Sequence, residues 1–259
     1  MDITALFNEN EKPLENIPAN GGFCGILRKI ACVGDSMSSG EFEAISENSE
    51  KTYHDMFEFS WGQFLARMTG TTVYNFSRGG MTAKEYCETF AEQNDFWNED
   101  KKCNAYIIAL GVNDLMNMNM PAGTTDDVDL EDYKNNKPTF AGYYGKIILK
   151  YKEIQPDAKF FLLTVPNDSV WDNRRKEHTD LIYKFAELFS NCYVLDLGKY
   201  GPVFDETFKK RFFLGGHMNP CGYNLIGQMV MSYIDYIIRH NMDDFSQVGF
   251  IGTGYQYKK

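Results

Sequence analysis

A serine stands where the first strongly apolar run of the chain ends. The run Lys29 to Val33 is followed by Gly34-Asp35-Ser36, which places a small residue, an acid and a hydroxyl where the chain must turn. A serine in such a turn is exposed and held by the backbone, as the nucleophile of an acyl transfer is. The triplet is also a common turn composition, so by itself it does not separate a catalytic serine from a turn.

Two further strand ends carry groups that could stabilise an oxyanion. Residues 75 to 82 include Gly79-Gly80, and residues 110 to 114 include Asn113. A glycine amide and an asparagine side-chain amide can donate hydrogen bonds to the oxyanion of acyl transfer, beside the N–H of the nucleophile. Alone, the two glycines fit a turn and the asparagine fits a helix cap. Their joint position after the second and third strands favours the catalytic interpretation.

Of the four histidines, only His217 lies in a loop directly before the last predicted helix. The sequence predicts that His178, in a segment rich in charged residues, and His240, in the last turn of a helix, are surface residues. The role of His54 is undecided, because this residue could line the pocket. His217 is therefore the candidate general base for the serine.

These four motifs resemble, in order and spacing, the blocks of the SGNH (GDSL) hydrolase superfamily, which contribute Ser, Gly, Asn and His. The resemblance implies Ser36 as nucleophile, His217 as base, and oxyanion donors from Ser36 N–H, Gly80 N–H and the Asn113 side chain. Gly80 is preferred over Gly79 because it directly precedes the Met-Thr pair that resembles the family's block. The resemblance also implies a flavodoxin-like, five-stranded parallel sheet of order 2-1-3-4-5.

One position departs from that family. An aspartate usually stands three residues before the histidine, where this chain has Leu214. The site is then either a Ser-His dyad, in which a backbone carbonyl of residues 214 to 216 accepts from the imidazole, or an atypical triad. Three distant carboxylates remain candidates for the third member: Asp205, Asp196 and Glu206. Asp35 is expected to brace the turn rather than to face His217.

Five short apolar runs must position these motifs. Stretches long enough for helices separate them, and this alternation predicts a parallel sheet. Their nearly continuous hydrophobicity is typical of strands that helices cover on both faces. The predicted fold class is therefore α/β, with three α/β/α layers. The runs are Lys29 to Val33, Thr72 to Phe76, Ala105 to Leu110, Lys159 to Val165 and Cys192 to Leu197.

Helical periodicity lies between and after these runs. Trp61 to Met68 and Ile147 to Ile154 repeat apolar residues at helical spacing, which predicts crossover helices. The last helix has the fullest set of signals. Asn219 can cap it, Pro220 suits its first turn, and Asn241 follows its basic last turn.

Two insertions exceed a simple strand and helix unit, residues 41 to 59 and residues 117 to 138. Both follow strand ends, where insertions in open α/β sheets often shape a ligand site. The acidic cluster at residues 126 to 129 is interpreted as a solvated loop rather than a calcium site, because the chain has no EF-hand spacing.

Length and composition restrict the architecture and the partners. With 259 residues, the chain is expected to form a single hydrolase domain, 1–259, with an N-terminal arm 1–28 and a C-terminal tail 243–259. The net charge of −10 disfavours nucleic acid as a partner. Six cysteines show no C-x-x-C pair and no zinc-binding spacing. Neither a metal nor a cofactor is expected.

Targeting signals are sparse. No run approaches the roughly 20 apolar residues of a membrane span. The first residues lack the basic and apolar regions of a signal peptide, which predicts a cytoplasmic protein unless a leader was removed.

The predicted reaction is the hydrolysis of a carboxylic ester through an acyl-enzyme. An acetyl ester on a carbohydrate is favoured, because the chain is rich in aromatic residues and has no Leu- and Phe-rich lid for a long acyl chain. Leu214 keeps open a non-catalytic, carbohydrate-binding member of the same fold. A phosphate-binding loop at Gly34 to Gly40 is disfavoured, since it lacks a Gly-Lys-Ser/Thr ending and is followed by Glu41. The expected partner is a small-molecule or glycan ester, and the oligomeric state stays open.

Overall fold

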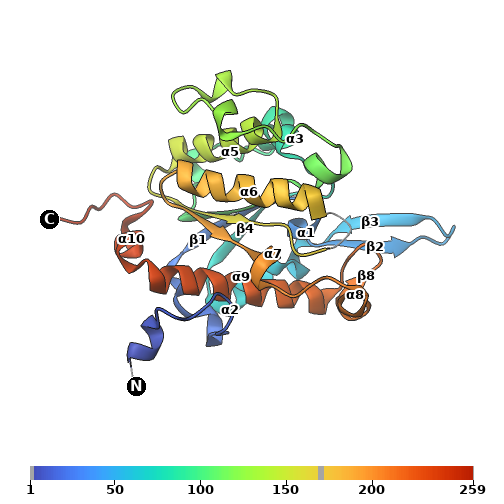
Figure 1. Ribbon diagram of the computed structural model, residues 1–259, viewed down its shortest axis with the longest axis horizontal. Helices are drawn as coiled ribbons and strands as arrows, with labels where there is room; N and C mark the ends of the chain where they lie inside the picture. The colour runs from blue at the N-terminus through green and yellow to red at the C-terminus, as the bar shows by residue number, and fades with distance from the viewer. Residues whose placement is uncertain (1–2, 169–171, 259) are drawn as a thin grey trace.

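A computed structural model describes residues 3–168 and 172–258. Its centre is a five-stranded, all-parallel sheet of spatial order β4-β1-β5-β6-β7 (Figure 1). In chain order this is 2-1-3-4-5, so the predicted sheet is confirmed. The observed strands end at, or within two residues of, the predicted runs. They are β1 (Lys29–Gly34), β4 (Thr72–Ser77), β5 (Ala105–Ala109), β6 (Lys159–Leu163) and β7 (Cys192–Leu195).

Helices cover both faces of this sheet, and α5 and α6 lie opposite α2 and α9 (Figure 1). Each face is closed by its own cluster of buried apolar side chains, which explains why the strands are apolar on both sides. The three predicted layers are therefore present. The longer helices are α2 (Trp61–Thr69), α5 (Phe140–Ile154), α6 (Asp172–Leu188) and α9 (Pro220–His240).

Local signals place the ends of the helices. The side chain of Asn219 accepts from Gly222 N and caps α9, with Pro220 in the first turn, as the sequence predicts. Helix α5 begins seven residues before the predicted segment, because Thr139 caps it at Gly142 N. The shorter helices are α1 (Ser36–Ser39), α3 (Ala83–Glu85), α4 (Ala91–Gln93), α7 (Leu197–Tyr200), α8 (Glu206–Phe212) and α10 (Met242–Phe245).

Two antiparallel hairpins lie outside the main sheet. The first insertion forms β2 (Glu41–Ile45) and β3 (Lys51–Asp55), which project beyond the body of the molecule (Figure 1). A short pair, β8 (Phe213–Leu214) and β9 (His217–Met218), precedes α9. Strands β2 and β9 are in contact, so the first insertion lies against the C-terminal loop.

The second insertion carries its acidic cluster on a turn. Asp126 is exposed, as a solvated loop requires. Asp127 is buried instead, and its carboxylate accepts from Thr124 N, Lys137 Nζ and Thr139 Oγ1. The cluster is thus partly a structural turn.

The N-terminal arm is held on α9 by a buried ionic network. Arg239 makes two hydrogen bonds to the carboxylate of Glu11, at 2.6 and 2.8 Å, and a third to Asp235 at 2.9 Å. All three side chains are at least nine-tenths buried. The hydrogen bonds from Arg239 hold the pKa of Glu11 below its usual value. The arm is therefore a packed part of the fold.

Replacing Glu11 with alanine is expected to lower the free energy of unfolding by about 3–5 kcal/mol, because it leaves the Arg239 charge buried with half of its partners. Urea unfolding at pH 7 measures the change. Glu9→Ala, at an exposed position on the same arm, is the matched control and should change stability by less than about 0.5 kcal/mol. Equal effects of the two variants would contradict the structural role of Glu11.

Candidate active site

The four predicted motifs meet at the carboxyl edge of the sheet. The register pairs Gly34 of β1 with Ser77 of β4 and with Ala109 of β5, so the three strands end level with one another. The segments that follow them open into one cavity of about 600 Å³. Ser36, Gly80, Asn113 and His217 all line this cavity, so the structure brings together the predicted nucleophile, base and oxyanion donors.

Ser36 is the first residue of α1, directly after the turn that leaves β1. Asp35 caps this short helix, and its Oδ1 accepts from Met37 N at 3.1 Å. Burial raises the pKa of Asp35 to about 7. In the part of the chain that the structure describes, Asp35 holds the turn and neither a hydrogen bond nor an ion pair joins it to His217, in agreement with the interpretation of the sequence.

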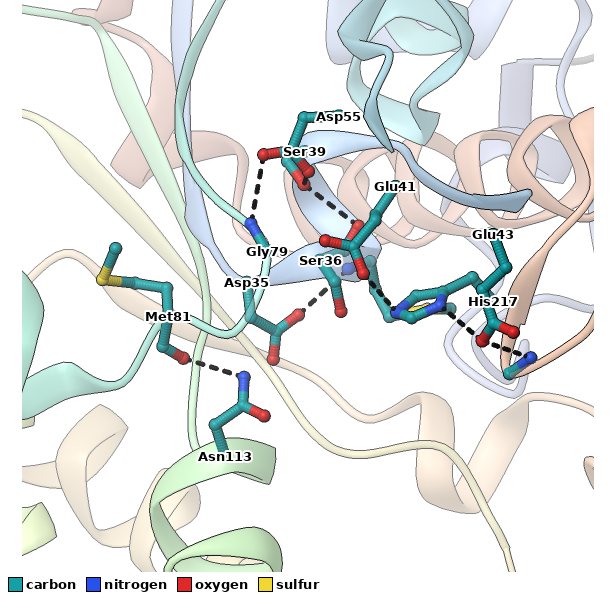
Figure 2. A network of polar contacts seen from close by, with 12 residues as sticks. Asp35, Ser36, Ser39, Glu41, Glu43, Asp55, Gly79, Met81, Asn113 and His217 are labelled. Carbon is teal, nitrogen blue, oxygen red and sulfur yellow. Dashed lines mark hydrogen bonds and ion pairs between the residues drawn. The ribbon is translucent and has the colours of Figure 1, made fainter. Parts of the chain in front are cut away.

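The Gly80 and Asn113 turns are tied to each other. Asn113 Nδ2 donates to Met81 O at 3.0 Å, and both carboxylate oxygens of Asp114 accept from Ala83 N, at 2.9 and 3.1 Å (Figure 2). Asp114 is fully buried, which raises its pKa to about 6. Gly80 itself has a φ of +72°, in the left-handed region that favours glycine. Hydrogen bonds therefore hold the two turns that carry the candidate oxyanion donors against each other.

The amide of Asn113 has a defined orientation. Asn117 Nδ2 donates to Asn113 Oδ1 at 2.7 Å, so the oxygen is taken and the nitrogen faces Met81 O. An amide nitrogen has two hydrogens, and the bond to Met81 uses one of them. The second hydrogen remains for a group in the cavity.

His217 contacts a carboxylate at each ring nitrogen. Its Nδ1 lies 3.1 Å from Glu43 Oε1, and its Nε2 lies 3.0 Å from Glu41 Oε1. Figure 2 shows the two carboxylates on opposite sides of the ring, with Ser36 on the Glu41 side. Within the described residues no hydrogen bond joins Ser36 to His217. Catalytic hydrogen bonds often form only when substrate is bound, so the missing hydrogen bond is compatible with Ser36 and His217 acting as nucleophile and base.

Glu43 is held as an ionised acceptor. Its carboxylate contacts Lys51 Nζ at 2.7 Å and accepts from Gly216 N at 2.6 Å. The pKa of Glu43 is lowered, chiefly by the hydrogen bond from Lys51. Because an ionised carboxylate can only accept, the hydrogen of the contact belongs to His217 Nδ1.

The structure places the expected third members elsewhere. Asp205 caps α8 by accepting from Phe208 N. Asp196 is buried against Thr164, Tyr183 and Lys199 N. Among the described residues no hydrogen bond or ion pair joins either carboxylate to His217, and the imidazole contacts side chains rather than a carbonyl of residues 214 to 216.

Sequence reasoning missed Glu41 and Glu43, although it identified their insertion as one that shapes a site. A signal was present: the two glutamates are two residues apart in a β-strand, so they share one face. Asp55, at the end of the same hairpin, accepts from Ser39 Oγ and from Gly79 N (Figure 2). The hairpin thus contacts the nucleophile helix, the Gly80 turn and the histidine loop.

The surface prediction for His178 is wrong. The side chain is fully buried, and its Nε2 donates to Leu110 O at 2.9 Å. Gly111 has a φ of +128°, and a Cβ there would lie 2.4 Å from the imidazole. His178 thus packs under the turn that carries Asn113. The other two are less enclosed: His54 is exposed on β3, and His240 is half-buried at the end of α9.

Burial lowers the pKa of His178 to about 4, below the value of about 6.5 for an unfolded chain. As the pH falls between these two values, the unfolded state gains a proton that the folded state does not, so stability is lost. Urea unfolding should show about 2 kcal/mol more loss from pH 7 to pH 5 in the wild type than in His178→Gln.

His54→Gln is the control for that measurement, because it removes an exposed histidine. It should keep the wild-type pH dependence. If His178→Gln also keeps the wild-type pH dependence, the claim that His178 is buried in its neutral form is wrong.

Comparisons with known proteins agree with this architecture. The model of the GDSL-like lipase/acylhydrolase family matches residues 32–225. A search of curated proteins finds no match. No helix in the described ranges is long and apolar enough to cross a membrane.

Three solved structures illustrate the structural likeness. A G-D-S-L family protein from Desulfitobacterium hafniense DCB-2 has a TM-score of 0.53 at 20% identity, covering 80% of this chain and 99% of that one. A family two carbohydrate esterase from Clostridium thermocellum, in complex with cellohexaose, has a TM-score of 0.55 at 17% identity, covering 90% and 66%. An acetyl xylan esterase, AlAXEase, has a TM-score of 0.52 at 17% identity, covering 80% and 99%. At these sequence identities the comparison shows a shared fold and nothing more.

Proposed function

Because the chain belongs to the GDSL-like lipase/acylhydrolase family, it is a hydrolase that acts on ester bonds, and we propose that Ser36 is its nucleophile and His217 its general base. The observation that carries this proposal is the convergence of Ser36, Gly80, Asn113 and His217 on one cavity. No other histidine lines the cavity except His178, which donates its Nε2 hydrogen to a backbone carbonyl.

In the first step, Ser36 Oγ attacks the ester carbonyl carbon while His217 Nε2 takes the hydroxyl proton. The carbonyl oxygen becomes an oxyanion that accepts from Ser36 N–H, Gly80 N–H and Asn113 Nδ2. When the intermediate collapses, Nε2 returns the proton to the alcohol oxygen, and the acyl group stays on Ser36. Water, deprotonated by the same nitrogen, then attacks the acyl carbon. The bond from this carbon to Ser36 Oγ breaks, Nε2 returns the proton to Oγ, and the acid is released.

Glu43 is the proposed third member. Its ionised carboxylate would keep the hydrogen of His217 on Nδ1, which leaves Nε2 as the acceptor that the first step needs. It would also stabilise the imidazolium that forms when Nε2 takes the proton. This assignment completes an atypical triad and makes a dyad unnecessary.

An acetyl ester on a carbohydrate is the proposed substrate. Two structural neighbours, a carbohydrate esterase bound to cellohexaose and an acetyl xylan esterase, support this choice. The alternative is a carbohydrate-binding protein of the same fold that does no chemistry. The position of Glu43 at His217 Nδ1 argues against this alternative. The chain has Leu214 where an aspartate usually orients the histidine, and Glu43 would supply the missing carboxylate from the hairpin.

Ser36→Ala is expected to abolish turnover in a panel of small esters, because it removes the attacking oxygen. Asn113→Ala should lower kcat by about 10²- to 10³-fold, the scale for one lost oxyanion donor. A fluorophosphonate probe should label the wild type but not Ser36→Ala. A wild-type chain that neither turns over esters nor takes the label would favour the carbohydrate-binding alternative.

Glu43→Gln should lower kcat by between about 10- and 10⁴-fold, because a neutral amide no longer fixes the tautomer or stabilises the imidazolium. Asp205→Asn is the matched comparison, since asparagine can still cap α8. It is expected to keep wild-type activity. The opposite ranking of the two variants would assign the third member to Asp205 instead.

A further inference from the structure

The carboxylate of Glu41 lines the cavity and has few groups nearby that could balance its negative charge. Its side chain is 12% exposed, and His217 Nε2 is its only ion-pair partner within the described residues. Its backbone is fixed, because Tyr223 Oη donates to Glu41 O at 2.7 Å. Glu43, two residues away, has Lys51 and Gly216 N as further donors. Glu41 has no equivalent of either.

The surroundings of Glu41 disfavour its charge. Burial raises its pKa, with smaller contributions from Asp55 and Glu43, and only His217 acts in the opposite direction. A partly buried carboxylate is stabilised by hydrogen-bond donors, and among the described residues only His217 contacts the carboxylate of Glu41. The carboxylate is therefore open to a donor from a molecule in the cavity, such as water or a substrate.

The contact with Nε2 also opposes the proposed reaction. Nδ1 keeps its hydrogen for Glu43, and a neutral imidazole has only one N–H. A favourable contact between the Glu41 carboxyl group and Nε2, 3.0 Å apart, therefore needs a second proton, on either Nε2 or the carboxyl group. In both cases Nε2 is occupied and cannot accept from Ser36. The base becomes available when Glu41 turns to another donor.

The position of Glu41 indicates which half of the ester supplies that donor. In ester hydrolysis, Nε2 delivers its proton to the oxygen of the leaving alcohol. A carboxylate 3.0 Å from Nε2 is therefore beside the alcohol half, whereas the acyl half faces the oxyanion donors. A neutral hydroxyl suits this carboxyl group best, because it can donate to the ionised form and accept from the protonated form.

On the basis of the function proposed above, we propose that Glu41 binds a free hydroxyl next to the ester on the alcohol half of the substrate. This contact draws the carboxylate away from His217 Nε2 and frees the base. Glu41 would thus select esters of diols and sugars over simple alkyl esters. A substrate that lacks the hydroxyl would leave the histidine blocked.

A matched pair of esters tests this selection. The 2-hydroxyethyl and 2-methoxyethyl esters differ only in the donor, and both would carry the acyl group that the wild type hydrolyses fastest. We expect kcat/KM of the wild type to favour the hydroxyethyl ester by about 10- to 100-fold, the scale of a hydrogen bond to a charged group. In Glu41→Ala this preference should fall to about one, with the methoxyethyl ester hydrolysed faster than by the wild type, because no carboxylate then contacts His217 Nε2.

Glu41→Gln provides a second variant of the same shape, in case alanine disturbs the hairpin. It should reduce the preference in the same direction. Glu47→Gln, exposed on the loop of the same hairpin, should keep the wild-type preference. A preference that is equal in the wild type and both Glu41 variants overturns the proposal, and so does an equal loss of activity toward the two esters.

Labelling of Ser36 separates the two levels of failure. If the fluorophosphonate labels Ser36 and both esters turn over without discrimination, the role of Glu41 is wrong and the ester hydrolysis stands. If neither labelling nor turnover occurs, the proposed catalytic residues fail, and the selection by Glu41 fails with them.

Discussion

The contact between His217 Nδ1 and Glu43 is the interaction on which the candidate site depends. It joins residues 174 positions apart, one on the hairpin after the nucleophile and the other on the loop before the last helix. Gly216 N donates to the same carboxylate, so Glu43 connects the hairpin to the histidine loop at two points, while Lys51 holds the carboxylate from within the hairpin. Such a network gives the imidazole one orientation, which a histidine on an exposed loop would lack.

The parallel sheet supplies the complementary constraint. Its register places the ends of β1, β4 and β5 side by side, so that the nucleophile and the two oxyanion turns open toward the same space. Asp114 and Asn113 then connect the two oxyanion turns, and Asp55 connects the Gly79 amide to the hairpin. The donors are thereby arranged before substrate arrives, which is the basis of electrostatic stabilisation of a transition state.

Two glutamates on one strand face carry different roles because their surroundings differ. A lysine keeps Glu43 ionised, whereas burial and neighbouring carboxylates raise the pKa of Glu41. Environments that separate the pKa values of paired acids commonly separate their functions as well. Here Glu43 would orient the imidazole at all times. Glu41 would contact Nε2, the nitrogen that acts as the base, until a substrate hydroxyl replaces that contact.

The sequence by itself determined the parallel sheet, the last helix and the four motifs, which depend on local patterns such as apolar runs, Asn219 as a cap, and turn residues at strand ends. The strand order followed from the resemblance to a known family. Only the tertiary structure decided which acid meets His217, because Leu214 leaves the usual position vacant and the acid comes from a distant hairpin. It also decided that His178 is buried, since its hydrogen bond to Leu110 spans 68 residues and its neighbours in the sequence are charged. Local patterns report how a segment folds, whereas a contact between distant segments is set by how the whole chain packs.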